Sequence, residues 1–122
     1  MIAGKKFPLD KDEIILKINS PKDKVKGPYC VVVKDLKKRW AIVALRWDNR
    51  LNSLGIRWFH DKAGFPFNRQ STWFIIPKEL ESFVFTLLKD DGNKAILSKF
   101  LYENDPKGGK ELKANFHPEK EH

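Results

Sequence analysis

Residues 40–47 read WAIVALRW, an almost unbroken apolar run that constrains the fold more than any other segment. A strand with both faces buried has such a continuous pattern, whereas a strand with one solvated face alternates polar and apolar residues. We therefore expect a central, covered strand here. A basic turn at residues 35–39 precedes it, and the β-branched segment at residues 29–34 predicts a neighbouring strand.

Turn residues divide the rest of the first two thirds of the chain into further short strands. In the segment LGIRWFH, Leu54, Ile56 and Trp58 alternate with Gly55 and Arg57, so the two sets point to opposite faces. The loop that follows, at residues 61–71, is long for a hairpin. In all, about five strands are predicted, at residues 12–18, 29–34, 40–47, 54–60 and 72–76.

Two helices are predicted after the last strand. Pro77 can begin the first, because proline is favoured at the first helical position. The acidic turn at residues 90–93 ends that helix and can cap the second. Both helices have one apolar stripe with the i, i+3, i+4, i+7 spacing of an amphipathic helix. The stripes are Leu80, Phe83, Val84 and Leu87 in the first, and Ile96, Leu97, Phe100 and Leu101 in the second.

From Tyr102 onward, the chain combines mixed charge with a glycine pair and two prolines. This composition predicts one α+β domain at residues 1–101, followed by a charged, flexible tail at residues 102–122.

The composition excludes several classes of protein. At 122 residues the chain is the length of one domain, and 41% hydrophobic content is too high for a disordered basic tail. No apolar stretch approaches the roughly 20 residues of a membrane span, and no signal peptide is evident. A single cysteine, Cys30, cannot form an intrachain disulfide and is read as a small buried apolar residue. We expect a cytoplasmic protein without a metal or other cofactor.

The net charge of +8 is concentrated in one part of the chain. Residues 1–39 carry 11 basic and five acidic side chains, while the tail carries four and five. All five arginines lie between Arg39 and Arg69, interleaved with tryptophans. Arginine pairs with phosphate and stacks on bases, and tryptophan offers a large stacking face. The combination is typical of proteins that bind single-stranded nucleic acid.

The junctions between the expected elements also follow the pattern of one known family. The strand YCVVVKD leads through the basic turn into a strand that begins with tryptophan and ends in WDN. An IRW strand and a glycine-containing loop come next, and WFIIP then runs into the acidic helix start PKELE. In this order of elements, residues 29–88 resemble the positive cofactor four family of transcriptional coactivators, particularly its short bacterial relatives.

The resemblance implies a curved antiparallel sheet backed by a helix, a homodimer formed through that helix, and single-stranded DNA bound along the sheet. Together with the arginine and tryptophan cluster, it nominates nine residues that would bind nucleic acid, with lysine and arginine holding phosphates and tryptophan stacking on bases. They are Lys37, Lys38, Arg39, Trp40, Arg46, Trp47, Arg57, Trp58 and Arg69.

Other interpretations of the same residues remain open. The tryptophans can be core residues, or they can line an apolar pocket for a small ligand or a protein partner. A metal-dependent nuclease would need carboxylates that converge near Asp48 or Asp61. The pair His60-Asp61 is not assigned to a metal, since neighbouring strand residues point to opposite faces. The sequence contains no nucleophile elbow, phosphate loop or dinucleotide fingerprint, so no catalytic residue is nominated.

Overall fold

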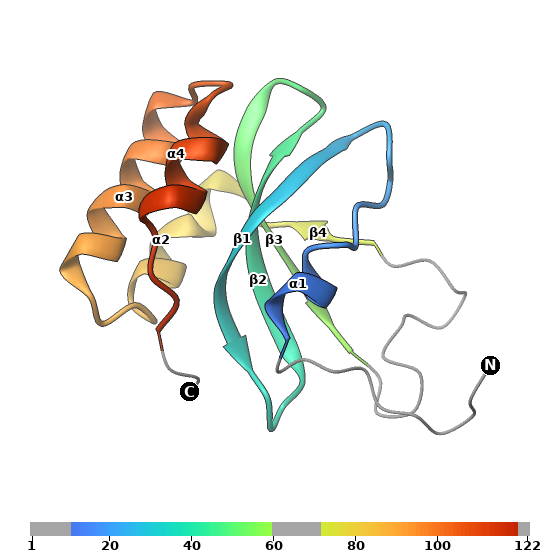
Figure 1. Ribbon diagram of the computed structural model, residues 1–122, viewed down its shortest axis with the longest axis horizontal. Coiled ribbons are helices and arrows are strands. Elements are labelled where there is room, and N and C mark those ends of the chain that lie inside the picture. The colour runs from blue at the N-terminus through green and yellow to red at the C-terminus, as the bar shows by residue number, and fades with distance from the viewer. Residues whose placement is uncertain (1–10, 60–71, 120–122) are drawn as a thin grey trace.

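The computed structural model describes residues 11–59 and 72–119 (Figure 1). Four strands form one sheet in the order β1-β2-β3-β4, and each neighbouring pair is antiparallel. No helix in these two ranges is long and apolar enough to cross a membrane. The elements are α1 (Asp12–Ile15), β1 (Val25–Asp35), β2 (Trp40–Trp47), β3 (Leu51–Trp58), β4 (Phe74–Ile75), the 3-10 helix η1 (Lys78–Leu80), α2 (Glu81–Phe85), α3 (Asp91–Glu103) and α4 (Gly108–Asn115).

The β2 strand lies inside the sheet and is buried at every position from Ala41 to Arg46, which confirms the prediction of a central, covered strand. Tight turns join it to both neighbours. In the turn before it, the side chain of Asp35 accepts a hydrogen bond from the Lys38 amide at 2.8 Å. In the turn after it, Asp48 and Asn49 both have positive φ, as hairpin turns with a right-handed strand twist require.

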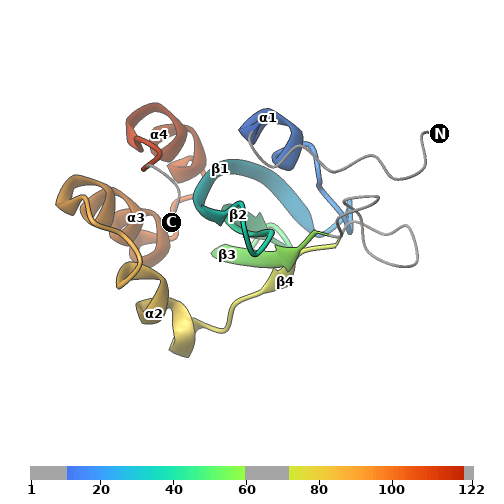
Figure 2. The same ribbon diagram turned by 90° about the horizontal axis from the view of Figure 1, so that it is seen from below.

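Each face of the sheet carries its own apolar core. On one face the sheet packs against α2, α3 and α4, and on the other it packs against α1 (Figures 1 and 2). We call these the helix-side core and the α1-side core. The helix-side core contains Cys30, Val32, Val33, Ile42, Ala44, Leu54, Val84, Leu88, Leu97, Phe100, Leu101, Leu112 and Phe116, and the α1-side core contains Ile15, Ile18, Val25, Val31, Ala41, Val43, Leu45, Phe59 and Trp73.

The α+β class and the antiparallel sheet agree with the prediction, but the described residues form four strands in place of five. The segment at residues 12–18, predicted as a strand, contains the short helix α1. Asp12 and Glu13 favour a helix start because acidic groups interact well with the positive end of the helix dipole. Ile15 and Ile18, three residues apart, are both buried in the α1-side core, so the spacing of the apolar residues was helical.

The two predicted helices are present with different lengths. After Pro77 the chain forms η1 and then only five residues of α2. The second helix, α3, begins where its cap was expected: the Asp90 side chain accepts a hydrogen bond from the Asn93 amide at 3.0 Å. Its residues Leu97, Phe100 and Leu101 are buried, as the apolar stripe indicated.

The C-terminal segment differs from the flexible tail that its composition suggested. It contains α4, in which Gly108, Gly109 and Leu112 are buried, and Phe116 follows them into the helix-side core. Asn93 also binds the main chain of His117 in both directions, at 2.6 and 3.0 Å. Only two large apolar residues anchor the segment, which explains why its charge dominated the sequence pattern.

The short strand β4 pairs with only part of β3, and main-chain groups next to that part form hydrogen bonds with other elements. The Asn52 amide donates to Asn104 Oδ1 at 2.7 Å, and the Asn52 carbonyl accepts from Lys78 Nζ at 2.7 Å. The Leu54 carbonyl accepts from the Ile76 amide at 2.8 Å. These bonds satisfy main-chain groups that a further strand would otherwise pair.

Close packing of α4 on β1 gives the first prediction. A Cβ at Gly109 would overlap the ring of Tyr29, whereas the atoms nearest to a Cβ at Gly108 would lie 3.4 Å away. Gly109→Ala should therefore lower the free energy of unfolding by about 1–3 kcal/mol, because overpacking forces neighbours to shift. Gly108→Ala is the matched control and should stay within about 1 kcal/mol of the wild type. Urea denaturation measures both, and equal effects would contradict the packing of α4.

Candidate functional site

One end of the sheet brings basic and aromatic side chains together. Register pairs Asp35 of β1 with Trp40 of β2, and Trp40 with Trp58 of β3. The turn that carries the exposed Lys37 and Lys38 therefore lies at the same end as Trp58. Trp58 is 65% exposed, an unusual state for a tryptophan on a strand.

A second exposed aromatic residue lies on the same face. Phe74 of β4 pairs directly with Ile56, and Trp58 is two residues further along β3, so Trp58 and Phe74 are diagonal neighbours. Phe74 is 73% exposed. We call Lys37, Lys38, Trp58 and Phe74 the Trp58–Phe74 surface.

The sequence interpretation missed Phe74. The sequence predicts a strand at residues 72–76 and nominates none of its residues, but strand alternation puts Trp73 and Phe74 on opposite faces. Trp73 is buried, and its indole nitrogen donates to the Ile18 carbonyl at 2.8 Å. Alternation could have indicated that one of the two aromatics faces outward, although it could not say which.

Arg39 and Trp40 connect this surface to the rest of the protein. Arg39 adopts a positive φ of 59° at the end of the turn, and its Nε donates to the Phe59 carbonyl at 3.3 Å. The Phe59 amide donates in return to the Arg39 carbonyl at 2.8 Å. Trp40 is half-buried against the helix-side core, directly opposite Trp58. The turn is therefore fixed to the end of β3.

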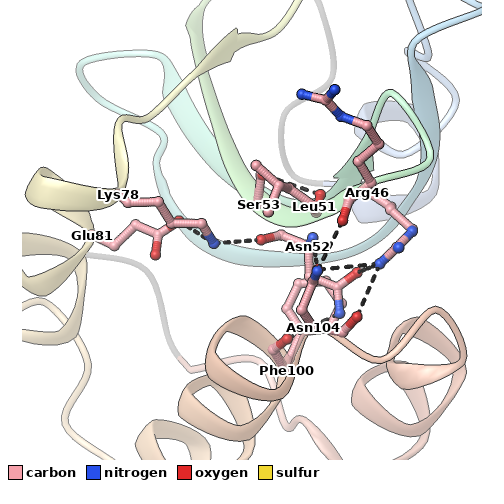
Figure 3. Close-up of polar contacts among 9 residues, drawn as sticks. Arg46, Leu51, Asn52, Ser53, Lys78, Glu81, Phe100 and Asn104 are labelled. Atoms are coloured by element: carbon pink, nitrogen blue, oxygen red, sulfur yellow. Dashed lines mark hydrogen bonds and ion pairs between the residues drawn. The ribbon is translucent and has the colours of Figure 1, made fainter.

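Arg46 has a different environment at the opposite end of β2. Its side chain is only 5% exposed. Its Nη1 donates to Asn52 Oδ1 at 2.8 Å and to the carbonyl and side-chain oxygens of Asn104, each at 3.3 Å (Figure 3). Nη2 donates to the Asn49 carbonyl at 3.4 Å. Arg46 thus joins the sheet to the end of α3, and the structure does not bring it to the Trp58–Phe74 surface.

Asn52 is the centre of this polar network. Besides its bond with Arg46, its Nδ2 donates to the carbonyls of Phe100 and Asp105 at 2.9 and 3.0 Å. Lys78, which binds the Asn52 carbonyl, also lies 3.4 Å from the carboxylate of Glu81 (Figure 3). Burial raises the pKa of Glu81, and the nearby Lys78 opposes that shift. The network couples β3 to both α2 and α3.

The remaining nominated residues are also separate from the Trp58–Phe74 surface. Trp47 is half-buried against the α1-side core at the far end of β2. Arg57 is 2% exposed and points to the face opposite Trp58, where its guanidinium carbon lies 4.8 Å from the centre of the Phe59 ring. Burial lowers the pKa of Arg57 to about 10. Arg69 lies outside the described residues.

The other interpretations of the sequence find less support in the described parts of the chain. A pocket of about 170 Å³ opens between α3 and α4, and none of the described residues that line it is a tryptophan. That volume is below the roughly 300–1,000 Å³ of small-molecule sites. Across residues 11–59 and 72–119, no group of three or more His, Cys, Asp or Glu side chains could hold a metal ion. Asp48 instead contacts Lys24 at 3.2 Å, while His60 and Asp61 are not described.

The role of Asn52 gives the second prediction. Asn52→Ala removes three side-chain hydrogen bonds and leaves the buried Arg46 with fewer acceptors. The free energy of unfolding should fall by about 2–4 kcal/mol, because unpaired buried polar groups are costly. Asn115→Ala, at an exposed position with one side-chain bond, should change it by less than about 0.5 kcal/mol. Urea unfolding of the two variants compares them, and a small change for Asn52→Ala would count against the network.

Comparisons with known proteins assign no family to the chain. No protein-family model matches the sequence, and neither the curated proteins nor the solved structures yielded a match.

Proposed function

We propose that this protein binds single-stranded nucleic acid at the Trp58–Phe74 surface, with little preference for sequence. The observation that carries the proposal is the exposure of two aromatic side chains on one sheet face, beside a turn with two exposed lysines. Exposed apolar side chains that lie together mark interaction sites. Bases stack on such rings and phosphates pair with lysine, so one strand of nucleic acid can satisfy both groups.

The spacing of the two rings favours a single strand over a duplex. Diagonal neighbours on antiparallel strands are about 7–8 Å apart, whereas successive bases in duplex DNA rise by about 3.4 Å. Two adjacent bases must therefore separate from one another to reach Trp58 and Phe74. A flexible single strand can separate its bases without breaking base pairs. Stacking does not distinguish the bases strongly, so binding at this surface should have little preference for sequence.

The net charge and the resemblance to the positive cofactor four family support the same class of ligand. Lys37 and Lys38 are the phosphate-binding residues in this proposal, and Arg39 and Trp40 hold the turn and Trp58 in place. Arg46, Trp47 and Arg57 are left out because they are buried or half-buried elsewhere. We place this activity in the cytoplasm, where a single cysteine such as Cys30 remains reduced.

Replacement of Trp58 tests the proposal directly. Trp58→Ala should weaken binding of a labelled 15-nucleotide single strand by roughly 5- to 150-fold, which corresponds to the 1–3 kcal/mol of one stacked base. Trp58→Phe should retain most of the affinity. Tyr102→Ala is the matched control, since Tyr102 is 75% exposed but lies on α3 near the opposite end of the sheet. Fluorescence anisotropy at low salt measures all four proteins, and equal affinity of Trp58→Ala and wild type would refute the proposal.

Salt dependence separates the lysine contacts from the aromatic ones. Each phosphate contact that is lost should reduce the slope of log affinity against log salt by about 0.7 for a single strand. The double variant Lys37→Ala, Lys38→Ala should therefore have a shallower slope than wild type, while Trp58→Ala should keep the wild-type slope. Lys110→Ala, an exposed lysine on α4, serves as the control for net charge.

A homodimer is a second proposal, which rests on a different surface. The resemblance implies dimerisation through the helix that follows the sheet, and Leu80 of η1 and Phe83 of α2 are 47% and 65% exposed there. Exposed apolar residues that lie close together mark contact surfaces between proteins.

Sedimentation equilibrium tests this second proposal. The wild-type chain should sediment as a dimer at micromolar concentration, and Phe83→Ser should shift it to monomer without loss of helical signal. Tyr102→Ser should not change the mass. A monomeric wild type, or a dimer that Phe83→Ser leaves intact, would overturn the proposed interface and leave the proposed nucleic-acid surface unaffected.

A further inference from the structure

Arg57 is one of the buried charged residues that the proposed function does not use. It lies on β3 directly opposite Ala41 of β2, which in turn pairs with Lys34 of β1. Because directly paired residues share a face, two cationic side chains flank one alanine on the α1 side of the sheet. Arg57 points away from Trp58, so this site is independent of the Trp58–Phe74 surface.

The guanidinium of Arg57 lacks a counter-ion among the described residues. Nε donates to the carbonyl of the adjacent Trp58 at 3.4 Å. Nη1 and Nη2 are buried, and neither has a hydrogen-bond partner within the part of the chain that the structure describes. Asp12 of α1 pairs with Lys34 at 2.7 Å.

An unpaired buried guanidinium costs free energy of folding. Arg46 is also buried, and it provides a comparison within the same protein. A buried charge is tolerated when hydrogen bonds and an opposite charge replace its hydration. Arg46 has four such bonds through its Nη atoms. For Arg57, the stacking contact with Phe59 at 4.8 Å satisfies one face of the guanidinium but none of its Nη donors. Among residues 11–59 and 72–119 the two parallel N–H groups of the fork have no acceptor, and such a fork matches an oxyanion.

We propose that Arg57 anchors a binding site for a small carboxylate on the α1 side of the sheet. The carboxylate pairs with Nη1 and Nη2, and the apolar part of the ligand packs against the α1-side core, to which Ala41 and Phe59 belong. One uncompensated positive charge matches a monoanion. A phosphate dianion brings a second charge with its larger desolvation cost, so an apolar carboxylic acid suits the site better.

Hexanoate is the probe, because it combines one carboxylate with a short apolar chain. It should raise the melting temperature of the wild-type chain by roughly 3–6 °C at ten times its dissociation constant, compared with chloride at equal ionic strength. Arg57→Met should lose this response. Arg50→Met is the matched control, since the Arg50 side chain is 75% exposed, and it should respond as wild type does.

A measurement on the wild-type chain keeps the test valid if Arg57→Met does not fold. In a protein with labelled arginine side chains, hexanoate should shift the Nε–H resonance of Arg57 saturably and leave that of Arg50 unchanged. Arg57→Lys should bind more weakly, because an ammonium lacks the planar fork.

Three results would overturn the proposal. The first is an equal rise in melting temperature for wild type and Arg57→Met, and the second is no shift of the Arg57 resonance. The third is a response to inorganic phosphate that exceeds the response to hexanoate. If the second result is found and Asp61→Asn does move the Arg57 resonance, the counter-ion belongs to the chain itself.

Discussion

Burial of β2 on both faces is the constraint on which the rest of the structure depends. Because residues 41–46 contact solvent on neither side, each face of the sheet needs its own cover. The chain supplies α2, α3 and α4 for one face and α1 with Trp73 for the other. A chain of 122 residues has little material for two cores. Even the short segment around Leu112 and Phe116 is therefore used in packing.

The same constraint explains the two classes of arginine. Arginines that lie on the sheet are drawn into the covered region, so Arg46 and Arg57 are buried although their sequence context suggested a binding surface. The turn that carries Lys37 and Lys38 leaves the sheet, and both lysines are exposed there. Trp58 and Phe74 lie on the neighbouring strands β3 and β4, and both side chains are exposed. Position in the sheet, more than residue type, separates surface from core.

The sequence was informative where a pattern reflects a local cause. Continuous apolar character identified β2, turn residues identified its two hairpins, and Asp90 identified the start of α3. Prediction failed where the cause was tertiary. α1 has too few residues for its helical period to stand out from a β-branched run, and α4 is anchored by contacts with distant residues such as Tyr29. For the candidate site, Lys37, Lys38 and Trp58 followed from pattern and resemblance. The burial of Arg46 could not, because Asn104 is 58 residues away.

The closure of β3 by Asn104 and Lys78 affects how the protein behaves at high concentration. The two side chains occupy the amide and carbonyl of Asn52 in the way that a neighbouring strand would, and Ile76 occupies the next carbonyl. An exposed sheet edge is a template on which another chain can add and begin to aggregate. Here three groups from outside the sheet terminate hydrogen bonding at that position. The polar network that holds α3 in place thus also protects the folded protein from growth into a longer intermolecular sheet.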